Sequence, residues 1–222
     1  DLHSFPTRRS SDLPGWTHRL WSSEFRRLQE QAARRCVTPA MVFLAAYAEV
    51  LARWSANPHF LINIPLFDRQ EQDGALADVV ADFTNLVLLE VDCCQDMGFA
   101  QRVQTIQAQL HRDLAHSAYS GVQVQRDLAR LRGGGMAAPV VFASNLGMPL
   151  LDLDCREQFG NLHSMISQTP QVWLDFQLYE DDDGLLLAWD AVDALFPAGL
   201  IDTMFAAIVT WQIGRASCRE RV

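Results

Sequence analysis

The sequence predicts an α/β fold in which helices pack against a mixed, largely antiparallel sheet. Two patterns support this prediction. Residues 40–54 are apolar around nearly the whole helical circumference, which is typical of a helix buried against other structure. Residues 171–180 alternate between polar and apolar side chains, and a turn of three aspartates and a glycine follows them. This pattern indicates an antiparallel hairpin with a returning strand at 185–189.

Capping residues and periodicity predict the other elements. A helix is expected from Ser22 to about Cys36. Thr38 and Pro39 are an N-cap and a first helical residue, where the N–H that proline lacks would have no partner. We further expect strands at 59–67, 86–91 and 140–142 and a charged loop at 68–73. Three more helices are expected: one at 99–114 capped by Asp96, one at 122–131 that ends in three glycines, and a final one opened by Phe196 and Pro197.

The two ends of the chain are related as complementary DNA strands. Residues 3–12 can be coded by a DNA string whose reverse complement codes residues 213–222, and this string resembles a common library adapter. Chance is a poor explanation for ten consecutive antisense codons. We therefore predict that residues 1–13 and 213–222 are adapter-derived and that residues 14–212 are the native part.

Composition argues against several classes of function. Five of the 18 basic and three of the 27 acidic residues lie in those ends, so residues 14–212 have a net charge of −11. This charge argues against nucleic acid and anionic membranes as partners. No apolar run approaches the roughly 20 residues that cross a membrane. The four cysteines of this part stand at no metal-ligand spacing, so we expect no metal site and a reduced, cytoplasmic protein.

Four segments carry motifs, and together with connecting segments such as Leu114-Ala115-His116 and Tyr119-Ser120-Gly121-Val122 they cover nearly the whole of residues 14–212. The motifs are Thr38-Pro39-Ala40 through Trp54-Ser55, Asp82-Phe83-Thr84-Asn85-Leu86-Val87-Leu88-Leu89, Pro139-Val140-Val141-Phe142-Ala143-Ser144-Asn145-Leu146-Gly147, and Ser167-Gln168-Thr169-Pro170-Gln171-Val172-Trp173-Leu174-Asp175 leading to Trp189-Asp190. In this order they resemble the motifs of heterocyclization domains of nonribosomal peptide synthetases, which are specialised relatives of condensation domains. The fourth motif is the most specific.

The resemblance implies the chloramphenicol-acetyltransferase-like fold, in which two similar lobes form a V around the active site, with this chain as the C-terminal lobe. The family joins a carrier-bound acyl group to the amine of a carrier-bound Cys, Ser or Thr. It then closes the side chain onto the new amide and expels water, which leaves a thiazoline or oxazoline. The implied partners are peptidyl and acyl carrier domains, a downstream adenylation domain and the N-terminal lobe. No cofactor is implied except the phosphopantetheine arms of the carriers.

Asp175 is the predicted catalytic residue. Loss of hydroxide from the ring-closed intermediate needs a positioned acid, while a base takes a proton from nitrogen or from the attacking side chain. The strand period places Asp175 on a polar face beside Gln171 and Trp173, and the resemblance places the family's catalytic Asp there. The pattern alone favours Asp175 as a solvent-facing residue of a half-buried sheet, and the motif reverses this preference.

The third motif departs from the family. Its members commonly carry Thr at the position of Ala143, and that hydroxyl is thought to work with the Asp. Two alternatives are open. Either Ser144 or Asn145 substitutes for the missing hydroxyl, although strand alternation points Ser144 to the opposite face, or cyclodehydration is weakened in this protein.

Other motif residues are candidates for substrate binding. Asp82 and Thr84 either line the cleft or cap a turn before the next strand, and Gln168 precedes a proline where the chain crosses over. Gln171 and Trp173 share the polar face with the predicted catalytic residue. Two alternatives to a heterocyclization domain stay open: an ordinary amide-forming condensation domain, and a catalytically silent lobe that docks carriers. The histidine signature of amide-forming domains would lie in the other lobe.

Overall fold

The computed structural model describes residues 16–67, 79–132, 138–148, 151, 153–160, 169 and 171–217. Their strands form one six-stranded sheet in the order β1-β6-β5-β4-β2-β3. The strands are β1 (Trp16–Trp21), β2 (His59–Phe67), β3 (Thr84–Asp92), β4 (Val140–Ser144), β5 (Leu174–Asp181) and β6 (Gly184–Ala191). The helices are α1 (Ser22–Arg34), α2 (Pro39–Trp54), α3 (Phe99–Leu114), α4 (Gly121–Arg132), α5 (Leu153–Phe159) and α6 (Leu200–Ser217).

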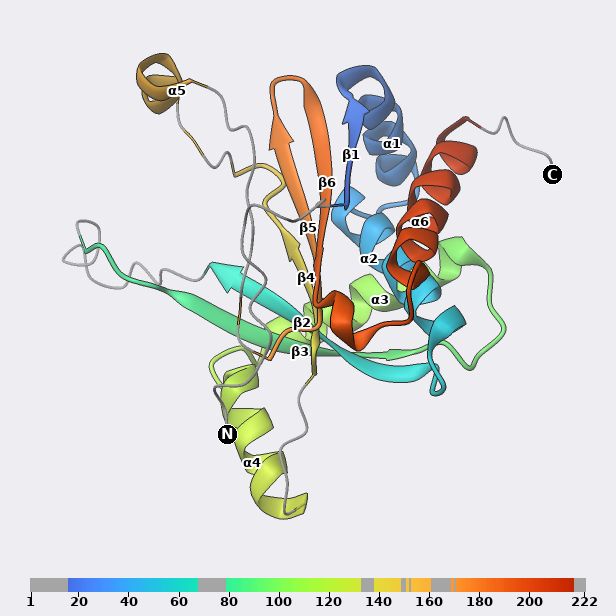
Figure 1. The fold of residues 1–222 in the computed structure, drawn as a ribbon, viewed down its shortest axis with the longest axis vertical. Helices are drawn as coiled ribbons and strands as arrows, with labels where there is room; N and C mark the ends of the chain where they lie inside the picture. The colour runs from blue at the N-terminus through green and yellow to red at the C-terminus, as the bar shows by residue number, and fades with distance from the viewer. Residues whose placement is uncertain are drawn as a thin grey trace.

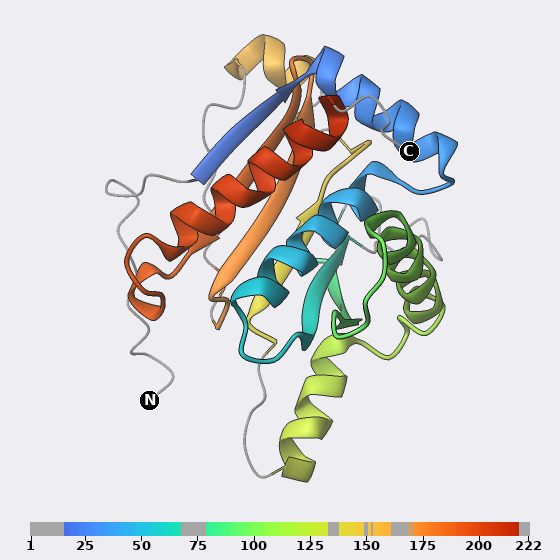
Figure 2. The same ribbon diagram turned by 90° about the vertical axis from the view of Figure 1, so that its right-hand side faces the viewer.

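The sheet is mixed and strongly twisted. β4 pairs in parallel with β2 and β5, whereas the β2–β3, β5–β6 and β1–β6 pairs are antiparallel. β2 and β3 run across the direction of β4, β5 and β6 (Figure 1). Helices α2 and α6 lie along one face of the sheet with α3 beside α2, while α4 projects away from them (Figure 2). The predicted fold class is therefore confirmed.

Helix α2 is the buried helix that its apolar sequence predicts. It begins as expected, because the Thr38 hydroxyl accepts a hydrogen bond from the backbone N–H of Met41 at 3.4 Å and Pro39 occupies the first turn. Tyr47, at the middle of the helix, is fully buried against the sheet. Its ring lies 5.2 Å from that of Phe176 and 5.4 Å from that of Trp189, both at steep angles. Edge-to-face packing of this kind stabilises a core beyond the area that it buries.

The β5–β6 hairpin joins this core to the opposite face of the sheet. Leu174, Phe176 and Leu178 of β5 point into the helix-covered core and are 0–1% exposed. The alternate residues Asp175 and Gln177 therefore point to the other face, as predicted. These polar side chains are nonetheless buried, so β5 is covered on both sides.

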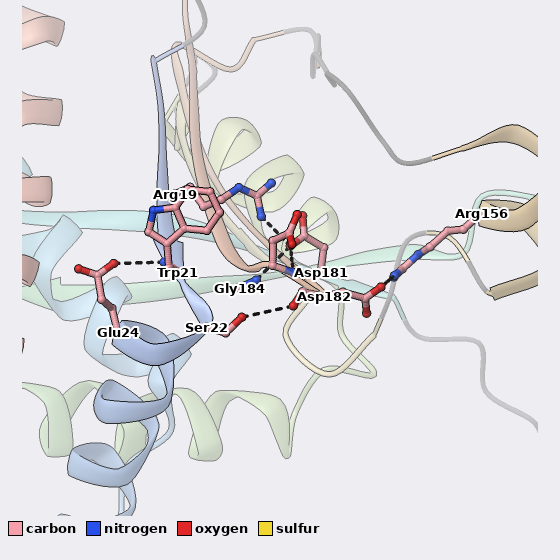
Figure 3. Close-up of polar contacts among 9 residues, drawn as sticks. Arg19, Trp21, Ser22, Glu24, Arg156, Asp181, Asp182 and Gly184 are labelled. Carbon is pink, nitrogen blue, oxygen red and sulfur yellow. Dashed lines mark hydrogen bonds and ion pairs between the residues drawn. The ribbon is translucent and has the colours of Figure 1, made fainter.

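The tip of the hairpin is fastened to the junction between β1 and α1 (Figure 3). The Ser22 backbone N–H donates to the carbonyl of Asp183 at 3.0 Å, and the Ser22 hydroxyl donates to that of Asp182 at 3.3 Å. Arg19 forms an ion pair with Asp181 at 2.6 Å. Gly184 has φ +136, and a Cβ there would lie 2.2 Å from the carbonyl oxygen of Leu20. The turn therefore requires glycine at this position.

Several predicted boundaries were wrong. The N-cap of α3 is Gly98, without a side-chain hydrogen bond, and not Asp96. Strand β5 begins at Leu174 and not at Gln171. Helix α6 begins at Leu200, after a turn in which the Leu200 N–H donates to the carbonyl of Pro197. Strand β1 and helix α5 were not predicted at all. The loop expected at 68–73 and the glycines at 133–135 lie outside the described residues.

Candidate active site

Asp175 lies on the sheet face opposite the aromatic core and is only 6% exposed. The interpretation of this residue as a solvent-facing surface carboxylate is therefore wrong. Asp175 pairs in register with Val141 of β4 on one side and with Asp190 of β6 on the other. A carboxylate held by two flanking strands has little freedom, which suits a group that must meet a reacting atom.

Gln177 connects the two carboxylates. Its Nε2 donates to Oδ2 of Asp175 at 2.6 Å and lies 3.3 Å from Oδ2 of Asp190. The hydroxyl of Tyr179 donates to Oε1 of the same amide. Gln177 and Tyr179 are 3% and 8% exposed and Asp190 is half-buried, so most of the network is shielded from solvent. Strand alternation produces this arrangement, because residues 175, 177 and 179 share one face.

The electrostatics of two tyrosines reflect the charge of this cluster. Burial, and then the negative charges of Asp175 and Asp190, raise the pKa of Tyr179 well above its usual value. The phenol therefore keeps its proton and remains a donor to Gln177. Burial, and then the charge of Asp175, also raise the pKa of Tyr47, which lies on the helix-covered side. The negative charge of Asp175 thus acts on groups on both faces of the sheet.

A row of residues crosses four strands at the level of Asp175. Asn63 of β2 pairs with Val141 of β4, which pairs with Asp175, which pairs with Asp190. Asn63 is 7% exposed, and two strand spacings put it roughly 10 Å from Asp175. Its amide nitrogen donates to the carbonyl of Ala138, and its oxygen accepts from Nε2 of Gln125 on α4 at 3.2 Å. Asn63 therefore anchors α4 to the polar face of the sheet.

The residues of the third motif lie on different faces. Ala143 pairs with Gln177, so its methyl group shares the face of Asp175. Ser144 pairs with Leu178 on the core side, and its buried hydroxyl has no hydrogen-bond partner among the described residues. The register does not bring the Ser144 hydroxyl to Asp175. Asn145 directly follows β4, is 9% exposed and donates its backbone N–H to the carbonyl of Leu178.

The candidate substrate-binding residues do not gather around Asp175. The carboxylate of Asp82 accepts the backbone N–H of Thr84 at 2.9 Å, so these residues form the turn that begins β3. The Thr84 side chain and backbone hold the pKa of Asp82 below its usual value. Thr84 lies four residues along β3 from the Asp175 row and three strands away from β5. These offsets correspond to roughly 13 Å along the strands and about 14 Å across them.

The fourth motif is also more spread than predicted. Gln171 has φ +69 and is exposed, and it precedes β5. Trp173 is 43% exposed, and its backbone N–H donates to the carbonyl of Pro139 at 2.8 Å. Neither belongs to the strand that positions Asp175, so the predicted polar face beginning at Gln171 was wrong. Gln168 lies outside the described residues.

Sequence reasoning missed three members of the polar cluster, Gln177, Tyr179 and Asp190, and also Asn63, which lies farther along the same face. The pattern already placed Gln177 on the face of Asp175, and the i, i+2 spacing extends that face to Tyr179. Asp190 stands at the end of the fourth motif, but its register with Asp175 follows only from the hairpin. No local pattern indicates Asn63.

Two further observations bear on the type of site. Within the described ranges, no group of three or more His, Cys, Asp or Glu side chains could hold a metal ion. In the same part of the chain, no single helix is long and apolar enough to cross a membrane, although α1 and α2, bent by 93°, together meet the criteria of length and composition.

Comparison with known proteins agrees with the fold and the motifs. Residues 16–210 match the condensation-domain family. The chain is 50% identical over 191 residues to pyochelin synthetase PchE of Pseudomonas aeruginosa (strain UCBPP-PA14), covering 86% of this chain and 13% of PchE. It is 47% identical over 177 residues to phenyloxazoline synthase MbtB of Mycolicibacterium paratuberculosis, covering 79% of this chain and 15% of MbtB. This chain therefore spans a small part of either relative.

A solved structure shares the architecture. The EpoB cyclization-docking bidomain from Sorangium cellulosum superposes with a TM-score of 0.79 and 38% identity, covering 96% of this chain and 44% of that chain. The overall architecture is thus shared with a peptide synthetase cyclization-docking bidomain. The chain belongs to the condensation-domain family. The resemblance to its heterocyclization members is confirmed by relatives whose names denote oxazoline formation and cyclization.

Proposed function

We propose that this chain is part of a heterocyclization domain that condenses a carrier-bound acyl group with a carrier-bound Cys, Ser or Thr and cyclodehydrates the product. The observation that carries the proposal is the position of Asp175. This residue ends the most specific motif and is buried on the sheet face opposite the helices, in a chain 38% identical to the cyclization-docking bidomain.

The proposed reaction has two stages. In the first, the amine of the acceptor residue attacks the donor thioester, which forms an amide and releases the donor carrier thiol. In the second, the acceptor hydroxyl or thiol adds to the new amide carbonyl, and the resulting hemiaminal loses its hydroxyl group as water to leave a C=N bond. Asp175 gives a proton to the departing hydroxyl or takes one from the ring nitrogen. Both acyl groups arrive on phosphopantetheine arms of carrier domains, and a downstream adenylation domain selects the acceptor.

Ala143 favours a second candidate, an amide-forming domain without efficient ring closure. The register puts Ala143 on the face of Asp175, beside Gln177, so a hydroxyl missing at this position is missing from the site face. The Ser144 hydroxyl lies on the other face and so does not replace it. Asn145 is the remaining candidate of the third motif.

Mass spectrometry of the carrier-bound product distinguishes the two candidates. The complete domain is incubated with a donor carrier bearing an acyl thioester and an acceptor carrier bearing Cys, Ser or Thr. A heterocyclization domain yields the azoline, which is lighter than the linear amide by one water. Accumulation of only the linear amide on all three acceptors would favour the second candidate.

A further inference from the structure

The contacts of Gln177 define a group that the motifs do not assign to the reaction. Its amide nitrogen faces two carboxylate oxygens, Oδ2 of Asp175 and Oδ2 of Asp190. A carboxylate only accepts hydrogen bonds, so the nitrogen and not the oxygen of the amide must face this pair. The Tyr179 hydroxyl donates to the amide oxygen on the other side and so agrees with the same orientation.

The two carboxylates are close in space. Both Oδ2 atoms contact one nitrogen, so they lie within roughly 6 Å of each other in a region that excludes most solvent. Like charges at this separation disfavour each other's ionised form, whereas an N–H donor favours it. The N–H group of Gln177 therefore opposes the mutual repulsion of the two carboxylates.

We infer that Gln177 is a positioning residue for ring closure: held by Tyr179, its amide fixes the rotation of the Asp175 carboxylate and couples it to Asp190. The proposed function supplies the reaction, but the geometry does not depend on it. Asp175 can exchange a proton with the hemiaminal only while its carboxyl group keeps one orientation, and the 2.6 Å hydrogen bond from the Gln177 amide restrains that orientation. Gln177 itself does not touch the substrate in this scheme.

Three elements of the described structure bring titratable groups near Asp175. Asp190 lies on β6, Tyr179 on β5 and Tyr47 on α2, while the register neighbour on β4 is the apolar Val141. Both tyrosines keep their protons at neutral pH, as tyrosines ordinarily do, and their raised pKa values extend the protonated range further into alkali. Among these groups, the two aspartates are therefore the ones whose protonation can change around neutral pH and below, and in a variant a titratable side chain at position 177 would add to them.

The first test needs only the chain itself. The carboxyl carbon of Asp175 is followed by 13C NMR against pH, with its signal assigned through Asp175→Asn. Gln177→Ala removes the donor, and Gln177→Glu adds a third carboxylate between the other two, so both should move the titration midpoint upward by about one pH unit or more. Gln101→Glu adds the same charge at an exposed position of α3 and should not move it. An unchanged midpoint in Gln177→Glu would overturn the inference.

The second test separates positioning from a structural role. In the complete domain with loaded carriers, Gln177→Ala should slow azoline formation by roughly 10- to 100-fold, as loss of an outer-shell partner does elsewhere. It should leave amide formation and KM unchanged, and the pH profile of ring closure should shift with the NMR midpoint. Tyr179→Phe should reproduce part of this effect. Tyr119→Phe, which removes an exposed hydroxyl bonded to Asp127, is its matched control.

The outcomes are distinguishable. If amide formation and ring closure fall together in Gln177→Ala, the residue is structural and the inference fails. If the wild-type domain forms no azoline, the proposed function fails, and the NMR midpoints alone then decide whether Gln177 controls the Asp175 carboxyl.

Discussion

Asp175 and Asp190 face each other across β5 and β6 at the same register position, and both contact Nε2 of Gln177. The separation of the two acids is therefore set by the geometry of one hairpin and not by loops. A hairpin of this kind forms from residues close in sequence, and its tip is fastened to the start of α1. We expect the site to be largely formed before any substrate binds.

Asp175→Asn keeps the shape of the side chain and removes its acid–base chemistry. Amide formation should survive, since it depends mainly on holding two carrier-bound groups together. Ring closure should fall by roughly 100-fold or more, the usual effect of losing a general acid or base. Mass spectrometry should show the linear amide, heavier than the azoline by one water. Asp96→Asn, at an exposed position, serves as the control. Azoline formation at the normal rate in Asp175→Asn would remove Asp175 from the mechanism.

Ala143→Thr restores a hydroxyl on the face of Asp175. Because Ala143 pairs with Gln177, the new side chain lies beside the polar network. If the missing hydroxyl limits the reaction, cyclisation should speed up several-fold while the rate of amide formation stays constant. Single-turnover measurements of both products would show this. No change in cyclisation would indicate that Asn145 or another group already supplies the function.

Gly184→Ala should destabilise the fold. The φ of +136 disfavours any side chain, and the added Cβ would lie 2.2 Å from the Leu20 carbonyl oxygen and 2.8 Å from the Ser22 nitrogen. Strained backbone of this kind alone costs about 1–3 kcal/mol. Urea unfolding should therefore show a loss of at least that size. Gly98→Ala, where no atom lies within 4 Å of the new Cβ, should lose less than about 1 kcal/mol. Equal losses would mean that the turn does not need glycine.

The Arg19–Asp181 pair should make stability depend on pH. Burial raises the pKa of Asp181, but Arg19 and the N–H groups of Asp183 and Gly184 outweigh this effect and keep the pKa below its usual value. The stabilisation is therefore present above the unfolded value of about 3.9 and is lost as pH falls through the folded one. Because the Asp181 side chain is 38% exposed, Arg19→Gln should lower the unfolding free energy by no more than about 1 kcal/mol at pH 7.

Chemical denaturation at several pH values tests this pair. The difference between wild type and Arg19→Gln should shrink as pH falls toward 3 and below, since the carboxyl group then loses its charge in both proteins. A difference that is constant from pH 7 to pH 3 would assign the effect to the packing of Arg19 over Trp21, where its guanidinium carbon lies 5.9 Å from the ring centroid.

Removal of residues 1–13 and 213–222 should leave the melting temperature unchanged within error. We propose that these ends are adapter-derived and were never selected to pack, and the family match lies inside the remainder, at 16–210. Helix α6 extends past residue 213 to Ser217, so the truncation shortens it. A drop of several degrees would show that the ends contribute to the fold.

The elements with strong local signals could be predicted from the sequence. Thr38 and Pro39 mark the start of α2, and the alternation from Leu174 to Glu180 marks β5, because capping and period depend on neighbouring residues. Strand β1 carries no such pattern: its sequence, Trp-Thr-His-Arg-Leu-Trp, becomes a strand through pairing with β6, more than 160 residues away. Tertiary pairing overrides weak propensity in such segments.

The candidate site was predicted only in part. The motif and the period gave Asp175, but the pattern treated its face as half-exposed, because polar side chains in a strand usually face solvent. Burial of that face and the contacts with Asp190 depend on which strands lie beside β5. These neighbours are β4 and β6, and the order of strands in the sheet cannot be read from the local pattern of β5. The role of Asp82 as a turn residue was left open for the same reason: it depends on where β3 begins.

The burial of β5 on both faces has a consequence for engineering. Randomised libraries on this strand would damage either the aromatic core or the polar network, so variants that accept a broader range of acceptor residues should not arise there. Leu186 and Ala188 of β6 share the polar face, in register with Tyr179 and Gln177, and belong to neither group. Variation at Leu186, which is half-buried, would reshape the surroundings of the polar network. Ala188 is 7% exposed beside Gln177, so a larger side chain there would disturb the support of Asp175.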